Sequence, residues 1–266
     1  MKNLAYLFLF CSVYSFSQPN CNAFLHQGDT LQYKACIEAE KTEKLYQFQR
    51  EFQETLDNAI KICPNFAYAY REKSTAYLKS GDFLTWKKLI DKAVDLDFGL
   101  NLGYRAWCRY QFFRDYKGAI KDIEKLDSLA SYDIGYSTNG DYHLNITKGM
   151  CYSAINQKKK AIKIFNQQLK TKDYSAGLYD YYQLGVTYFE VKDYTNALKS
   201  FAKQTEINDF ADNSYYKCKI YKTLKKQKEY KKYKEIALAL YAENKKLFDP
   251  YTRHFNSVYY ETIKNE

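Results

Sequence analysis

The chain has few of the residues that interrupt helices, with 3 prolines and 10 glycines among 266 residues. Alternating polar and apolar stretches, which indicate β-strands, are also scarce. This composition argues against a protein of strands and tight turns and favours helices joined by short turns. Hydrophobic residues make up 46% of the chain, which is enough for a buried core.

Signatures of catalysis and metal binding are missing as well. The 3 histidines are far apart, and neither a Cys-x-x-Cys pair nor a glycine-rich phosphate loop occurs. Paired acids such as Asp122 and Glu124 stand among lysines, as on a solvated helix face. We therefore expect a non-catalytic protein with no metal ion and no cofactor. An enzymatic alternative would need an unrecognised catalytic carboxylate in the stretch 133–141.

The N-terminus has the pattern of a removable signal peptide. Lys2 precedes a mostly apolar run over residues 4–13, and small residues follow at 15 and 17. The run is too short to span a bilayer, and no later apolar stretch is long enough to anchor the chain. We expect residues 1–17 to be removed and the protein to be exported, either periplasmic or secreted. A buried first helix is the alternative.

The cysteines fit an oxidising compartment. Cys21, Cys36 and Cys63 are close together in the chain, and one bridge among them, of open connectivity, would clamp the end of the fold. The other three mature cysteines fall at small-residue positions of expected helices, so we expect buried free thiols there. They are Cys108, Cys151 and Cys218.

One block recurs down the chain with a period in the thirties. It is clearest as Leu184-Gly185-Val186-Thr187-Tyr188-Phe189, then Lys192-Asp193-Tyr194, then Ala197-Leu198 and Phe201. Further good copies begin near Ala67, Leu100 and Tyr142, the end of an earlier copy includes Phe52, Leu56 and Ala59, and a weaker copy includes Tyr221 and Tyr233. Such a period, with two amphipathic segments in each copy, indicates a stack of helical hairpins.

The residues of one block explain why a hairpin forms. Gly185 lies where the partner helix comes closest, because a side chain there would hold the two backbones apart. Asp193 stands near the start of the second helix, where it can cap free N–H groups. Ala197 admits the first helix, and Phe201 is expected to fill the space between hairpins. Neither helix can bury its apolar face alone, so each hairpin needs a neighbour.

These residues resemble the tetratricopeptide repeat family over roughly residues 30–245. The resemblance implies an all-α fold, an α-solenoid coiled as a right-handed superhelix of about six hairpins. We place the solenoid at 18–244 and expect a final amphipathic helix over 245–266 that caps the last hairpin. Docking of this helix into a partner is the alternative.

Some positions depart from the family pattern. Trp107 and Trp86 stand where the family has small residues, which puts the local helix spacing in doubt. The stretch 133–141 adds length between two copies and contains the turn signal Asn139-Gly140. We expect a kink there, between two halves of three hairpins each.

The resemblance also implies where a partner binds, because such stacks bind through the concave surface lined by the first helix of each hairpin. The inward-pointing candidates are mostly aromatic, basic or amide residues: Tyr68, Arg71, Lys79, Asn101, Tyr104, Gln111, Tyr179, Tyr182 and Lys222. Tyrosine offers a rigid ring with one polar tip, and arginine pairs with carboxylates. We therefore expect an adaptor or scaffold that binds a protein or an extended peptide, with acidic or C-terminal carboxylate groups.

The net charge of +10 leaves a second function open. A groove of tyrosines and lysines could bind a polyanion, either nucleic acid or an acidic glycan. Lysines are scattered along the helices, however, including the run Lys158-Lys159-Lys160. This distribution is typical of a solvated face, so a protein partner is favoured over nucleic acid.

Overall fold

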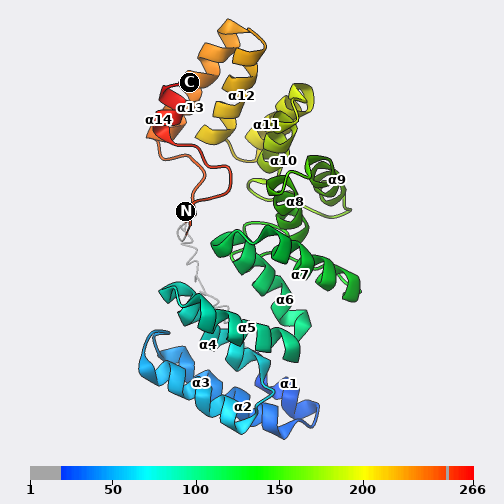
Figure 1. Ribbon diagram of the computed structural model, residues 1–266, viewed down its shortest axis with the longest axis vertical. Coiled ribbons are helices and arrows are strands. Elements are labelled where there is room, and N and C mark those ends of the chain that lie inside the picture. The colour runs from blue at the N-terminus through cyan, green and yellow to red at the C-terminus, as the bar shows by residue number, and fades with distance from the viewer. Residues whose placement is uncertain (1–18, 250–251) are drawn as a thin grey trace, which may run out of the picture. The chain divides into compact units, whose positions relative to one another are not determined.

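The computed structural model describes residues 19–249 and 252–266. The predicted signal peptide at 1–17 lies outside the described residues. Helices dominate this part of the chain, which contains no strand and a single isolated bridge, between Tyr136 and His143. The predicted all-α class is confirmed. The chain divides into two compact units, Met1–Asp97 and Phe98–Glu266, whose elements are labelled in Figure 1.

Unit 1 holds two helical hairpins, α2 with α3 and α4 with α5, and a short helix before them. Its elements are α1 (Cys21–His26), α2 (Thr30–Glu40), the 3-10 helix η1 (Lys41–Lys44), α3 (Arg50–Ile62), α4 (Ala67–Ser80) and α5 (Phe83–Leu96). A disulfide between Cys21 and Cys36 joins α1 to α2, while Cys63 is a buried free thiol. The expected bridge among these three cysteines is therefore Cys21–Cys36.

Unit 2 holds four hairpins, α6 with α7, α8 with α9, α10 with α11 and α12 with α13. The first six elements are α6 (Phe98–Cys108), the π-helix η2 (Arg109–Phe113), α7 (Tyr116–Leu129), α8 (Leu144–Ala154), α9 (Lys158–Leu169) and α10 (Asp180–Glu190). The last four are α11 (Tyr194–Ile207), α12 (Ala211–Thr223), α13 (Gln227–Ala242) and α14 (Tyr260–Lys264). With the two hairpins of unit 1, the predicted number of about six is confirmed. None of the described helices is both long and apolar enough to cross a membrane.

The hairpin α10–α11 shows why the repeat block is needed. A Cβ atom added to Gly185 would lie 2.5 Å from Phe201 Cε1, so α10 and α11 approach closely only because residue 185 is glycine. Phe201 is fully buried, and its ring stacks on Tyr216 of the next hairpin with centroids 5.9 Å apart. Phe201 thus fills the space between hairpins, as predicted.

Aspartates begin the second helices of three hairpins. The Asp193 carboxylate accepts the N–H of Asn196 at 3.1 Å, and Asp82 and Asp115 cap α5 and α7 in the same way. Each carboxylate satisfies an N–H group that has no partner within its helix. The predicted capping role of Asp193 is confirmed.

The units divide at a different place from the expected halves. The boundary lies between Asp97 and Phe98, whereas the stretch 133–141 lies inside unit 2. That stretch makes a turn in which the Gly140 N–H donates to the Ser137 carbonyl at 2.8 Å. A change of helix geometry follows Trp107, where α6 continues as the π turn η2.

The expected helix over 245–266 is wrong for most of its length. Only Tyr260–Lys264 is helical among the described residues of this range. The backbone N–H groups of Leu247 and Val258 donate to the side chain of Asp212 on α12. Because these N–H groups bond to a side chain on another helix, they do not form the hydrogen bonds to carbonyl groups four residues earlier that a helix needs. The short α14 does pack against α13 of the last hairpin.

Candidate functional site

Residues 247–249 and 252–258 lie between α13 and α14 and contain no helix, and we call these residues the resident loop. In Figure 1 the chain leaves the end of α13 and returns to α14, which packs against α13. The side chains that hold it come from η2, α10 and α12, from Tyr142 just before α8, and from Arg114 just after η2. These are the first helices of the hairpins and the residues that flank them.

Asp212, near the start of α12, holds both ends of the resident loop. Its Oδ2 accepts the Leu247 N–H at 3.0 Å, and its Oδ1 accepts the Val258 N–H. The carboxyl group is fully buried. Burial raises its pKa to about 6, although the two N–H donors favour the charged form.

Gln183 on α10 contacts the middle of the loop in two ways. Its Oε1 accepts the Asn256 side-chain amide at 2.8 Å, and its Nε2 donates to the Phe255 carbonyl at 3.3 Å. Tyr182, the preceding residue, donates its hydroxyl to the Asn256 carbonyl at 2.7 Å. Two successive carbonyl groups of the loop are therefore bound by neighbouring side chains of one helix.

His254 of the loop takes part in a chain of hydrogen bonds. Its Nδ1 lies 3.2 Å from the Phe255 carbonyl, so Nδ1 carries the proton and Nε2 accepts from the Tyr142 hydroxyl at 3.2 Å. The Tyr142 oxygen in turn accepts from Gln183 Nε2 at 3.1 Å. Burial lowers the pKa of the His254 imidazole, and the neutral form satisfies all of these contacts.

The π turn brings two further side chains to the loop. Gln111 donates to Asp249 Oδ2 at 2.8 Å and to Thr252 Oγ1 at 2.7 Å. Arg114, which follows the turn in a left-handed conformation (φ 55°), donates to the Arg253 carbonyl at 2.7 Å. The departure from the repeat pattern near Trp107 therefore places residues that hold the loop.

An aromatic pair receives the side chain of Phe255. Its ring centroid lies 6.2 Å from those of Tyr110 and Tyr116, at tilted or edge-on angles. Such geometries are favourable for aromatic rings. Phe255 packs in this way against the hydrophobic core around Tyr110 and Ile146.

The predicted groove residues of unit 2 fall into two groups. Gln111 and Tyr182 bond to the resident loop, Tyr179 places its ring 5.2 Å from His254, and Lys222 pairs with Glu266 at 3.2 Å. Asn101 and Tyr104 are buried on α6. Four of these six residues thus contact the C-terminal part of the chain.

In unit 1 the predicted residues Tyr68, Arg71 and Lys79 all lie on α4. Tyr68 is half-buried against the ring of Phe66, at 5.7 Å between centroids. Arg71 and Lys79 lie near the carboxyl group of Glu72, whose pKa is raised by burial and partly lowered by these two cations. As partner-binding residues they stay a prediction.

Sequence reasoning missed Tyr142, Gln183 and Asp212. Gln183 has a signal, because it lies four residues after Tyr179 and therefore on the same helix face. Asp212 has no comparable signal in the sequence, since its role depends on Leu247 and Val258 coming to it from another part of the chain.

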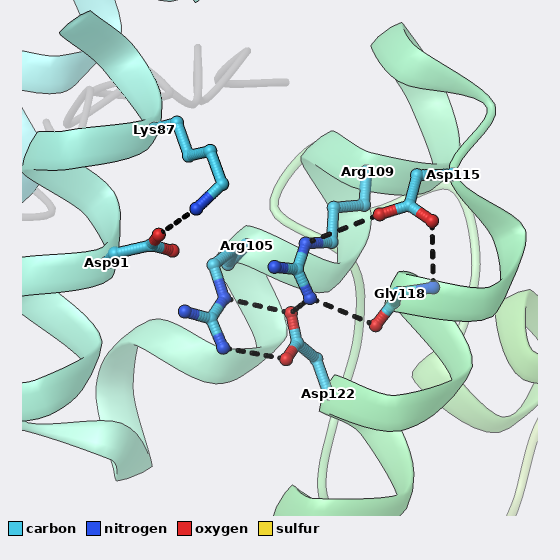
Figure 2. A network of polar contacts seen from close by, with 7 residues as sticks. All are labelled: Lys87, Asp91, Arg105, Arg109, Asp115, Gly118 and Asp122. Atoms are coloured by element: carbon cyan, nitrogen blue, oxygen red, sulfur yellow. Dashed lines mark hydrogen bonds and ion pairs between the residues drawn. The ribbon is translucent and has the colours of Figure 1, made fainter. Parts of the chain in front are cut away.

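The expectation that Asp122 lies on a solvated face is wrong. Figure 2 shows its carboxylate between two arginines of the same unit. Arg105 bonds it through two nitrogens at 2.7 and 2.9 Å, and Arg109 approaches at 2.8 Å. Asp122 is 2% exposed, so two cations compensate one buried charge. Glu124 is exposed and accepts the Tyr152 hydroxyl at 2.5 Å.

The stretch 133–141 brings an acid to a histidine, but both groups have structural roles. His143 Nδ1 accepts the N–H of Asn145 and caps α8, while Nε2 lies 2.8 Å from Asp133 Oδ1. Both ring nitrogens are therefore engaged within the fold.

A comparison with models of protein families identifies the repeat. The tetratricopeptide repeat model matches residues 142–173 and 181–209. These segments hold the hairpins α8–α9 and α10–α11. None of the curated proteins shows sequence similarity to the chain.

Solved structures show the same fold at low sequence identity. PilF of Pseudomonas aeruginosa is 13% identical, with 84% of this chain and 89% of that chain covered and a TM-score of 0.56. PilW, a widely conserved type IV pilus biogenesis factor, is 14% identical, with 84% and 90% covered and a TM-score of 0.58. Residues 142–173 and 181–209 are therefore two tetratricopeptide repeats, and the chain shares the fold of these solved structures.

Proposed function

We propose that this protein is a non-catalytic scaffold that binds an extended segment of a partner protein through the first helices of unit 2. One observation carries this proposal: Tyr182 and Gln183 already hold a segment of the chain itself, the turn at Phe255 and Asn256 of the resident loop. A surface that binds one peptide through its main-chain carbonyls has the chemistry to bind another.

Contacts of the C-terminal part of the chain support the acidic partner expected from the sequence. Gln111 binds the carboxylate of Asp249, and Lys222 binds that of Glu266. Both residues were predicted to line the groove. An acidic partner segment would therefore find donors at two places in unit 2. Tyr68, Arg71 and Lys79 are proposed as a separate binding surface on unit 1.

The paired lysines argue against the polyanion alternative. Within the run Lys158-Lys159-Lys160, Lys158 pairs with Glu190 and Lys160 lies 3.5 Å from Glu124. Neighbouring carboxylates thus offset two of the three charges, which weakens attraction for phosphate or sulfate groups.

Export is proposed on chemical grounds. The Cys21–Cys36 disulfide is the kind of bond that persists in an oxidising compartment such as the periplasm. This supports the expected removal of residues 1–17 and a periplasmic or secreted location.

The proposal is tested by crosslinking followed by affinity capture from the envelope fraction, with three versions of the full chain. Gln183→Met keeps the side-chain length but removes both hydrogen-bonding atoms, and Lys199→Ala changes an exposed residue of α11. We expect a partner captured by the wild type and by Lys199→Ala to be lost with Gln183→Met. Equal capture by all three would contradict binding through α10.

A further inference from the structure

The two ends of the resident loop are fixed independently of its middle. Asp212 holds the N–H groups of Leu247 and Val258 at the base of the loop. Beyond the base, Ile263 of α14 is fully buried in a cluster with Ala211 and Ala237. Release of the middle would therefore leave a closed loop, tethered at α13 and at α14.

The middle, which turns at Phe255 and Asn256, is held mainly through main-chain groups that every peptide offers. Arg114 donates to the carbonyl of Arg253, Gln183 to that of Phe255, and Tyr182 to that of Asn256. A carbonyl acceptor is common to all residue types, so these three donors do not distinguish one peptide sequence from another.

Two contacts depend on the side chain that the loop presents. The Phe255 ring lies between Tyr110 and Tyr116, and the Asn256 amide donates to Gln183 Oε1. The surface should therefore prefer a segment in which an aromatic residue is followed by asparagine. His254 adds a polar ring next to Tyr142.

We infer that the resident loop is an exchangeable internal ligand, which a partner protein displaces by placing a turn with an aromatic-Asn pair on Tyr110, Tyr116 and Gln183. The inference rests on the proposed function and deepens it by naming the class of partner and the step that controls access. Each bond to the middle of the loop is replaced by an equivalent bond to the partner, while Asp212 and α14 keep the loop attached.

The tether sets the strength of this competition. A segment linked at both ends reaches its site at an effective concentration on the order of millimolar. A partner segment must compete with that concentration. Its apparent Kd is therefore its intrinsic Kd divided by the fraction of molecules whose surface is open. Substitutions in the loop that weaken its contacts with the helices, and leave the helices unchanged, should then strengthen the binding of a partner.

The experiment uses the full chain and a labelled synthetic peptide with the sequence of residues 247–258. Fluorescence anisotropy compares the wild type with the loop variant Phe255→Ala/Asn256→Ala. We expect the loop variant to bind the peptide at least about 10-fold more tightly, because the internal competitor is weakened. The same peptide with alanine in place of its phenylalanine and asparagine should lose this gain.

A third protein locates the binding. Gln183→Met added to the loop variant should reduce binding of the peptide by about 10-fold, which is the equivalent of 1.4 kcal/mol. Equal affinity for the wild type and the loop variant would overturn the exchange inference and leave the proposed binding surface intact. Failure of the peptide to bind any version, with all versions folded by circular dichroism, would count against the proposed function itself.

Discussion

The side-chain amide of Asn256 donates to Gln183 Oε1 at 2.8 Å, which joins residues 73 positions apart in the chain. Gln183 lies on α10, in one of the two matched repeats, whereas Asn256 lies beyond the last hairpin. The end of the chain is therefore bound by the helices that a partner would be expected to contact. Access to these helices depends on the resident loop, and the loop in turn depends on a few titratable groups.

Asp212 makes stability depend on pH with a sign opposite to that of most aspartates. Its pKa is about 6 in the fold, against about 3.9 for an exposed aspartate. The folded state therefore holds the proton more tightly, so the contribution is fully present below pH 4 and is lost as pH rises through 6. We expect the difference in unfolding free energy between the wild type and Asp212→Asn to fall over this window. Urea titrations at pH 4, 5, 6 and 7 measure it, and a difference independent of pH would contradict the burial argument.

At acidic pH, protonation of His254 should loosen the resident loop. The pKa of its imidazole is lowered from the usual value of about 6.5, so the neutral form is stabilised by the fold and the contribution is lost as pH falls below 6.5. Protonation would make Nε2 a donor facing Tyr142, whose oxygen already accepts from Gln183. Hydrogen exchange of the Phe255 and Asn256 amides should quicken from pH 7 to pH 5, after correction for intrinsic rates. In His254→Phe, which cannot be protonated at this position, the corrected rates should change less with pH than in the wild type, and the remaining change should come from Asp212.

Gly185→Ala should destabilise unit 2 by about 1–3 kcal/mol, because the new methyl group meets the Phe201 ring. Phe201→Leu would relieve the clash at the cost of a cavity. We therefore expect the double variant to lose less free energy of unfolding than the sum of the two single losses. Guanidinium unfolding of the three variants measures the coupling, and strictly additive losses would show that residues 185 and 201 do not meet.

The disulfide should stabilise unit 1. The bridged cysteines are 15 positions apart, for which chain entropy predicts about 3 kcal/mol. Cys36→Ser should lower the unfolding free energy of unit 1 by that amount, as followed by hydrogen exchange of α2 and α3. A reductant should bring the wild type to the same level and leave Cys36→Ser unchanged. If the reductant lowers both equally, another thiol is responsible.

Asp122→Asn should be costly, because Arg105 and Arg109 would lose the buried charge that they share. Removal of one partner from a buried ion pair typically costs about 3–5 kcal/mol. Glu54→Gln breaks the exposed pair with Arg50 and serves as the matched control, with no measurable change expected. Thermal unfolding of both variants makes the comparison, and an equally mild effect of Asp122→Asn would show that the two arginines rearrange.

The repeat itself was predictable because its residues act locally. Gly185, Asp193, Ala197 and Phe201 occupy a fixed spacing, and each contacts a helix of its own or the adjacent hairpin. Such contacts follow from helical geometry and short turns, so the hairpins and their approximate starts could be predicted from the amino-acid sequence. Four candidate groove residues of unit 2 also contact the C-terminal part of the chain, for the same reason of helical periodicity.

The course of residues 247–258 could not be predicted in this way. Phe248, Phe255, Val258, Tyr259 and Ile263 suggest an amphipathic helix when only local spacing is considered. In the fold, backbone groups of this segment bond to Asp212, Tyr182 and Gln183, which are far away in sequence. Local pattern carries no information on such partners.

The amino-acid sequence by itself determined a stack of tetratricopeptide-like hairpins, because close helix approach at glycine and capping by aspartate depend on neighbours within one repeat. The tertiary structure alone decided that the end of the chain lies on the first helices of unit 2. It also decided that Asp122 and Asp212 are buried rather than solvated. These outcomes depend on contacts between distant segments, whose free energies are set by burial and hydrogen bonding in the assembled fold.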